Sequence, residues 1–71
     1  MTARAINTGT DQLLARQDGG VLVLTLNRPE ARNALSDDLS PALRRMLANA
    51  AGDDSVGALV LTGTGTAFCA G

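Results

Sequence analysis

The feature that most constrains the fold is a pair of short apolar runs without any charge, Val21–Leu26 and Ala58–Thr62. Each run is continuously apolar, apart from threonine, and such runs are typical of strands buried on both faces of a sheet. Between them, apolar residues recur at spacings of three and four, which marks one face of a helix. A strand, a helix and a second strand predict a β-α-β crossover whose two strands lie parallel.

The helical pattern is carried by Leu35, Leu39, Leu43, Met46, Leu47 and Ala50. Ser36 is a candidate N-cap, so we expect a helix over about 36–51 with an irregular first turn around Pro41. A start at Ser40 is the alternative, because it places Pro41 at the preferred first helical position. Gly52 is the expected C-terminal cap. We expect Leu39, Leu43, Met46 and Leu47 to be buried, and Arg44 and Arg45 to be exposed.

The segment before the crossover reads as a hairpin. Residues 12–18 are predicted as a first strand, and Asp18-Gly19-Gly20 is a strong turn signal in front of the second. Residues 1–11 are small and polar, and we expect them to form a flexible N-terminal leader. The predicted organisation is therefore this leader followed by one α/β unit over 12–71.

Composition excludes several classes of protein. The chain has 71 residues, one cysteine (Cys69) and no histidine, so a disulfide within the chain is impossible and a closed zinc site is not expected. Net charge is −1 with no basic cluster beyond Arg44-Arg45, which argues against a nucleic-acid surface. The start carries no apolar signal segment, and no run is long enough to span a bilayer. A free cysteine without a signal peptide points to the cytoplasm.

Each local motif has a simple structural interpretation beside a functional one. Gly63-Thr64-Gly65 begins like a dinucleotide fingerprint, but Phe68 stands where the third glycine is required. A nucleotide-binding βαβ unit therefore stays as an alternative that binding of NAD against coenzyme A would decide. Cys69 has no histidine to activate it, so we expect a small buried side chain. The adjacent acids at 37–38 and 53–54 are expected to cap and solvate rather than to catalyse.

Two segments together resemble a known family. Residues 27–36, Asn-Arg-Pro-Glu-Ala-Arg-Asn-Ala-Leu-Ser, resemble the first acyl-CoA-site loop of the crotonase superfamily of enoyl-CoA hydratases and isomerases. Residues 60–71, Val-Leu-Thr-Gly-Thr-Gly-Thr-Ala-Phe-Cys-Ala-Gly, resemble the second loop of those enzymes. The resemblance covers roughly 12–71 and implies the first β-β-α-β portion of a crotonase-type spiral fold. By this resemblance the domain is truncated, because the family's domain is several times longer.

The resemblance also implies a site. Members of the family bind an acyl-CoA thioester and stabilise an enolate-like oxyanion with two backbone N–H groups. The residues implied to bind substrate are Ala31, Arg32, Ala34, Ala70 and Gly71. The first oxyanion donor is expected directly after Gly71, so no catalytic residue falls within the chain. Arg32 is implied to reach a CoA phosphate, Asn33 is expected to be structural, and Glu30 departs from the basic residue often found at its position.

The expected function is that of an enoyl-CoA hydratase in fatty acid metabolism, adding water to a 2-enoyl-CoA. The alternatives are another reaction of the superfamily, such as isomerisation or thioester hydrolysis, and a non-catalytic CoA-binding protein. The resemblance implies no cofactor other than the coenzyme A of the substrate, and no metal. It implies a homotrimer or a dimer of trimers, with no nucleic-acid or membrane partner.

Overall fold

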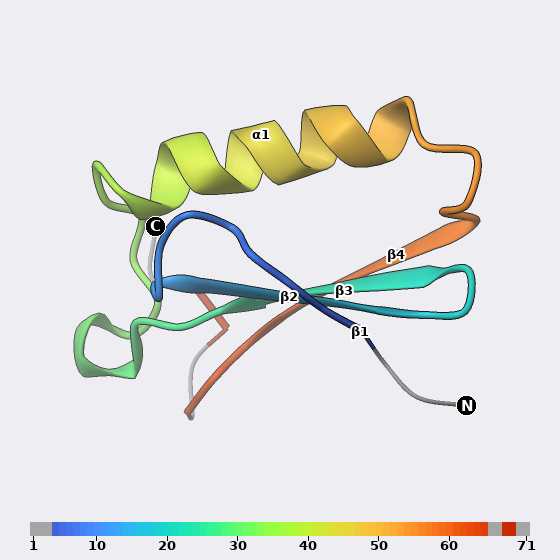
Figure 1. Cartoon of the computed structure of the whole chain (residues 1–71). Helices are drawn as coiled ribbons and strands as arrows, with labels where there is room; N and C mark the ends of the chain where they lie inside the picture. Colours follow the sequence, from blue (N-terminus) through green and yellow to red (C-terminus); the bar gives the residue numbers. More distant parts are fainter. Residues whose placement is uncertain (1–3, 66–67, 70–71) are drawn as a thin grey trace.

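The computed structural model describes residues 4–65 and 68–69. The elements are the strands β1 (Arg4–Ile6), β2 (Leu13–Asp18), β3 (Val21–Leu26) and β4 (Ala58–Gly63), the helix α1 (Leu39–Ala51) and the short 3-10 helix η1 (Pro29–Ala31). The strands form one sheet in the order β1-β2-β3-β4. Figure 1 shows α1 lying along one face of this sheet. The α/β architecture with a β-β-α-β core is as the sequence predicts.

The predicted hairpin is confirmed. β2 and β3 pair antiparallel from Leu13↔Leu26 to Asp18↔Val21, so the connecting loop is only the two glycines. Gly19 has φ +60, a conformation that residues with a Cβ rarely adopt. A further strand, β1, is not predicted by the sequence pattern and pairs antiparallel with β2 from Arg4↔Gln17 to Ile6↔Ala15. A strand of three residues is too short to show a period in the sequence.

The predicted crossover is also confirmed. β3 and β4 pair parallel from Val21↔Ala58 to Leu26↔Gly63, and α1 lies between them in the sequence. The carbonyl of Gly20 accepts hydrogen bonds from the N–H groups of Gly57 (2.7 Å) and Ala58 (3.1 Å), which fixes the beginning of β4 against β3. Both strands therefore end at the same edge of the sheet.

Helix α1 begins at Leu39, three residues after the predicted cap. The hydroxyl oxygen of Ser36 accepts a hydrogen bond from the N–H of Leu39 (2.9 Å), and its carbonyl accepts one from Ser40 (3.0 Å). Ser36 thus caps an irregular turn ahead of the helix. Pro41 becomes the third helical residue, where an N–H would have no partner within the helix. The helix ends at Ala51 and Gly52 caps it, as predicted.

The core is formed by one face of α1 and the facing sides of β2 and β3. Its buried members are Leu13, Ala15, Leu22, Leu24, Leu26, Leu39, Ala42 and Met46. The predicted burial of Leu39 and Met46 is confirmed, Leu43 is partly buried, and Arg44 and Arg45 are exposed as expected. The prediction for Leu47 is wrong, since its side chain is 38% exposed.

The predicted burial of β4 is wrong. Leu59, Val60 and Leu61 are 44%, 45% and 39% exposed. The reason is that the buried face of α1 packs onto β2 and β3, and no segment within 4–65 or 68–69 covers β4. Leu47 lies beside the beginning of β4 and shares its exposure. Cys69, predicted to be buried, is also exposed.

Residues 7–11, within the predicted leader, contact both the sheet and the helix. Thr8 is only 5% exposed, and its hydroxyl donates to the carbonyl of Leu13. The carbonyl of Thr8 accepts a hydrogen bond from the Arg45 guanidinium (2.8 Å). Arg45 therefore links this segment to α1 although much of its side chain faces solvent.

Candidate functional site

Two loops meet at the edge of the sheet where β3 and β4 end. The first leaves β3 after Leu26, and the second leaves β4 after Gly63, its register partner. The N–H of Thr64 donates to the carbonyl of Leu26 (2.9 Å), so the parallel ladder continues one step into the loops. The hydroxyl of Thr64 lies 3.3 Å from the side-chain oxygen of Asn27. The beginnings of both loops are thus held side by side.

The first loop is a compact set of turns set by its sequence. Pro29 opens η1, where its missing N–H costs nothing and its fixed φ suits the turn. Arg32 follows η1 with φ 54, and Asn33 has φ 59, so two consecutive residues other than glycine adopt the left-handed conformation. The guanidinium of Arg28 donates to the carbonyl of Ala34 and closes the loop. Such backbone geometry persists only where surrounding contacts enforce it.

Asn33 connects the two loops. Its side chain is fully buried at 0% exposure. Its Oδ1 accepts a hydrogen bond from the N–H of Arg28 (2.8 Å), and its Nδ2 donates to the carbonyl of Thr64 (2.8 Å), a residue of the other loop. The N–H of Asn33 also donates to the carbonyl of Arg28 (2.7 Å). The structural role predicted for Asn33 is confirmed, and it contacts Thr64 in the second loop.

Gly65 shows why the second loop needs glycine. It has φ +80, and a Cβ placed there would lie 3.3 Å from the Cβ of Pro29. Any larger residue would meet both backbone strain and a close contact with the first loop. The turn role predicted for this glycine is therefore accompanied by close approach of the two loops.

The structure places three of the five predicted substrate-binding residues on the first loop. Ala31 and Ala34 are half-buried, whereas Arg32 is exposed and its guanidinium is available to an anion. Ala70 and Gly71 lie outside the described residues. The sequence reasoning did not single out Arg28 or Thr64, which hold the loops in place. The position of Arg28 directly before a proline was the only sequence signal for it.

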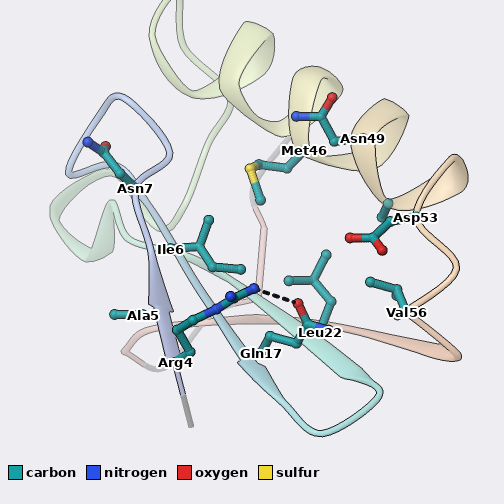
Figure 2. Close-up of a pocket in the computed structure, with 11 residues that line it drawn as sticks. Arg4, Ala5, Ile6, Asn7, Gln17, Leu22, Met46, Asn49, Asp53 and Val56 are labelled. Carbon is teal, nitrogen blue, oxygen red and sulfur yellow. Dashed lines mark hydrogen bonds between the residues drawn. The ribbon is translucent and has the colours of Figure 1, made fainter.

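A cavity of about 410 Å³ lies at the opposite end of the sheet from these loops. Figure 2 shows it between β1, the beginning of β3 and the last turns of α1, with Arg4 and Asp53 at its rim and Leu22 and Met46 inside. Arg4 donates there to the side-chain oxygen of Gln17 (3.3 Å). The cavity contains none of the residues predicted to bind substrate.

The hydroxyl of Ser55 (2.7 Å) and then its N–H (2.9 Å) donate to the carboxylate of Asp53 and lower its pKa. This pattern is a turn motif rather than an acid–base site. Within 4–65 and 68–69 there is no cluster of three His, Cys, Asp or Glu residues suited to a metal ion. None of the helices described there is long and apolar enough to cross a membrane.

Both loops lie within the region of the chain that matches known proteins. Residues 16–71 match the family model described as enoyl-CoA hydratase/isomerase. A probable enoyl-CoA hydratase of Mycobacterium tuberculosis is 46% identical over 61 residues, which is 86% of this chain and 24% of the relative. A 1,2-epoxyphenylacetyl-CoA isomerase of Escherichia coli K12 is 42% identical over 59 residues, covering 83% of this chain and 22% of the relative.

The solved structures agree with the sequence relatives. The crystal structure of an enoyl-CoA hydratase from Mycobacterium tuberculosis H37Rv superposes with a TM-score of 0.83 at 48% identity. The superposition covers 86% of this chain and 27% of that chain. The 71-residue chain thus spans about a quarter of the length of the relatives it matches. The matched region contains the two parallel strands, the helix between them and both loops.

Proposed function

Because the chain belongs to the enoyl-CoA hydratase/isomerase family, we propose that it forms part of an enzyme acting on acyl-CoA thioesters. The specific proposal is an enoyl-CoA hydratase that adds water to a 2-enoyl-CoA. One observation carries it: the family match runs through both loops, and these loops meet at the carboxyl ends of two parallel strands. In open α/β sheets ligands gather beyond those ends, and the same placement is proposed here by analogy.

In the proposed reaction this chain binds and orients the substrate. Ala31 and Ala34 line the CoA arm, Arg32 contacts a CoA phosphate, and Ala70 and Gly71 lead to the first backbone donor of the oxyanion hole. That donor lowers the barrier because it is aimed at the negative charge that develops on the thioester oxygen. The acids that move protons are proposed to lie in the part of the domain that this chain does not include.

The wider setting is proposed from the same family membership. The enzyme is a homotrimer or a dimer of trimers that works in the cytoplasm, in fatty acid metabolism. It uses no cofactor beyond the coenzyme A of its substrate, and it binds neither nucleic acid nor membranes.

An isomerase is the second candidate. The relative from Escherichia coli is named a 1,2-epoxyphenylacetyl-CoA isomerase, and its 42% identity is close to the 46% of the hydratase from Mycobacterium tuberculosis. The scaffold described here therefore accompanies more than one reaction. The sequence following Gly71 decides between a hydratase, an isomerase and a non-catalytic protein, through the acids it carries at the family's catalytic positions.

The proposal is tested with the longer protein that carries this chain. Purified protein is mixed with but-2-enoyl-CoA, and the loss of the conjugated thioester's ultraviolet absorbance is followed. Calorimetry with a saturated acyl-CoA measures binding separately from turnover. Hydration with saturable kinetics supports the hydratase. Binding without hydration contradicts the hydratase and supports the isomerase or the non-catalytic alternative, and absence of binding contradicts an acyl-CoA function altogether.

Arg32→Asn is expected to weaken acyl-CoA binding about fivefold at low salt, since it removes one charge-assisted contact to phosphate. Stability should be unchanged, because asparagine tolerates the left-handed conformation found at this position. The loss should shrink as salt screens the phosphate. Arg44→Gln, on the exposed side of α1, is the matched control. Equal affinities of Arg32→Asn and the parent at low salt would remove Arg32 from the site.

Ala70→Leu is expected to weaken acyl-CoA binding by about tenfold or more, because a large side chain keeps the backbone from approaching the ligand. Ala48→Leu is the matched control, since Ala48 is exposed on α1 and leucine is a good helix former. Calorimetry on both variants gives the comparison. If Ala70→Leu folds and binds as tightly as Ala48→Leu, the second loop does not approach the ligand.

A further inference from the structure

The side chain of Asn33 joins the body of the first loop to the carbonyl of Thr64 in the second. It is fully buried, and its two ends contact different loops. We propose that Asn33 is a positioning residue of the enzyme. It sets the direction in which the chain leaves β4 toward the oxyanion donor, and does so without touching the substrate. This inference rests on the proposed acyl-CoA function.

The role requires an amide in particular. The oxygen of Asn33 accepts from the N–H of Arg28 and the nitrogen donates to the carbonyl of Thr64, both at 2.8 Å. A carboxylate of the same shape supplies the acceptor but not the donor. Asparagine is also among the residues best suited to the left-handed backbone found here, at φ 59. Alanine would add backbone strain to the lost hydrogen bonds, so its effect would be ambiguous.

The side-chain nitrogen of Asn33 holds one peptide plane of the second loop. The N–H of Thr64 is bound to the carbonyl of Leu26 (2.9 Å), and its C=O is bound to Asn33. The N–H belongs to the Gly63–Thr64 peptide and the C=O to the Thr64–Gly65 peptide, so the two bonds hold two successive peptides and leave the backbone at Thr64 little freedom to rotate. Gly65 follows at φ +80 against Pro29. Because each residue is placed by the one before it, a small rotation of the Thr64–Gly65 plane causes a larger displacement further along the chain. The residues that follow lead to the proposed oxyanion donor. Small misplacement of such a donor costs transition-state stabilisation more than substrate binding.

The decisive variant is Asn33→Asp in the longer protein, measured with but-2-enoyl-CoA. It keeps the acceptor for Arg28 and the backbone conformation, and places a negative charge against the carbonyl of Thr64. At pH 8 we expect kcat to fall about tenfold or more, with KM within about threefold of the parent. Burial and the facing carbonyl disfavour the charged form, so the pKa of the introduced carboxyl group is raised. As pH falls through that pKa, the protonated group can donate to Thr64, and kcat should recover relative to the parent.

The matched control is Asn7→Asp. Asn7 is exposed, and its described hydrogen bond uses only the oxygen, which accepts from the N–H of Gly9 (2.8 Å). This variant should match the parent in kcat, KM and pH profile. If Asn33→Asp does not fold, Asn33→Gly replaces it, because glycine accepts the left-handed backbone without any charge. The same fall in kcat of about tenfold or more is then expected.

The outcomes separate two failures. A parent protein that neither binds nor converts acyl-CoA overturns the proposed function, and the positioning role with it. A parent that is active, together with a folded Asn33→Asp or Asn33→Gly variant of equal kcat, overturns the positioning role alone. A drop in activity that appears as higher KM with unchanged kcat also overturns it, since that result assigns Asn33 to uniform substrate binding.

Discussion

Heated alone in solution, the 71-residue chain is expected to lose its structure over a broad temperature range, without a cooperative transition. The physical reason is a core closed on one side only. Leu59, Val60 and Leu61 of β4 keep between 39% and 45% of their surface in water. The eight buried core residues come from β2, β3 and α1. A chain of this size has little excess of burial over conformational entropy even when its sheet is fully covered.

Differential scanning calorimetry measures this directly. A cooperative domain of this length absorbs about 50 kcal/mol on unfolding. We expect a heat-absorption peak far smaller than that, and melting curves from near- and far-ultraviolet circular dichroism that do not coincide. A sharp transition with equal calorimetric and van't Hoff enthalpies would show that the chain is an independent domain.

Leu24→Ala is expected to abolish the protection of the chain's backbone amides against hydrogen exchange, whereas Leu61→Ala should change that protection little. The two residues are register partners on neighbouring parallel strands, so they offer the same substitution on the same sheet face. Leu24 is 0% exposed and Leu61 is 39% exposed. Removing a fully buried leucine costs about 2–5 kcal/mol, which exceeds the stability available to a marginal fold. Truncating a leucine that is still partly in water costs a fraction of that.

Amide hydrogen exchange at low temperature gives the measurement. In Leu24→Ala, exchange of the β2 and β3 amides should approach the rate of an unfolded chain. In Leu61→Ala, protection of the same amides should stay close to that of the parent. Equal loss of protection in the two variants would mean that β4 is buried as deeply as β3. In the longer protein we expect further chain to cover β4, and Leu61→Ala then to become as costly as Leu24→Ala.

Local sequence chemistry was enough to predict β2, β3, α1 and β4, but not β1 or η1. Gly19 and Gly20 specify a two-residue hairpin turn because they tolerate the backbone angles it needs. The continuous apolar run of Val21–Leu26 predicted a strand buried on both faces, and four of its six residues are buried. The start of α1 was less well determined, because Ser36 and Ser40 both have capping chemistry. The structure uses Ser36 for an irregular turn and begins the helix at Leu39.

The candidate site was likewise only partly predictable from the sequence. The residue types of the first loop, read with those of the second, predicted the family that the comparisons then showed. The predicted parallel crossover also implies that both loops lie at the same edge of the sheet, because each follows one of the two parallel strands. The sequence did not reveal that Asn33 donates to Thr64, because the two residues lie 31 positions apart and only the parallel register brings them together.

The amino-acid sequence alone determined the β-β-α-β elements, the parallel crossover and the family, because each depends on local periodicity, turn chemistry or residue pattern. The tertiary structure alone decided which apolar faces are covered and which loop atoms meet. Leu24 and Leu61 are the same residue in runs of the same character, yet one is fully buried and the other is not. Burial depends on what packs against a strand. Helix α1 has only one apolar face, and this face packs against β2 and β3.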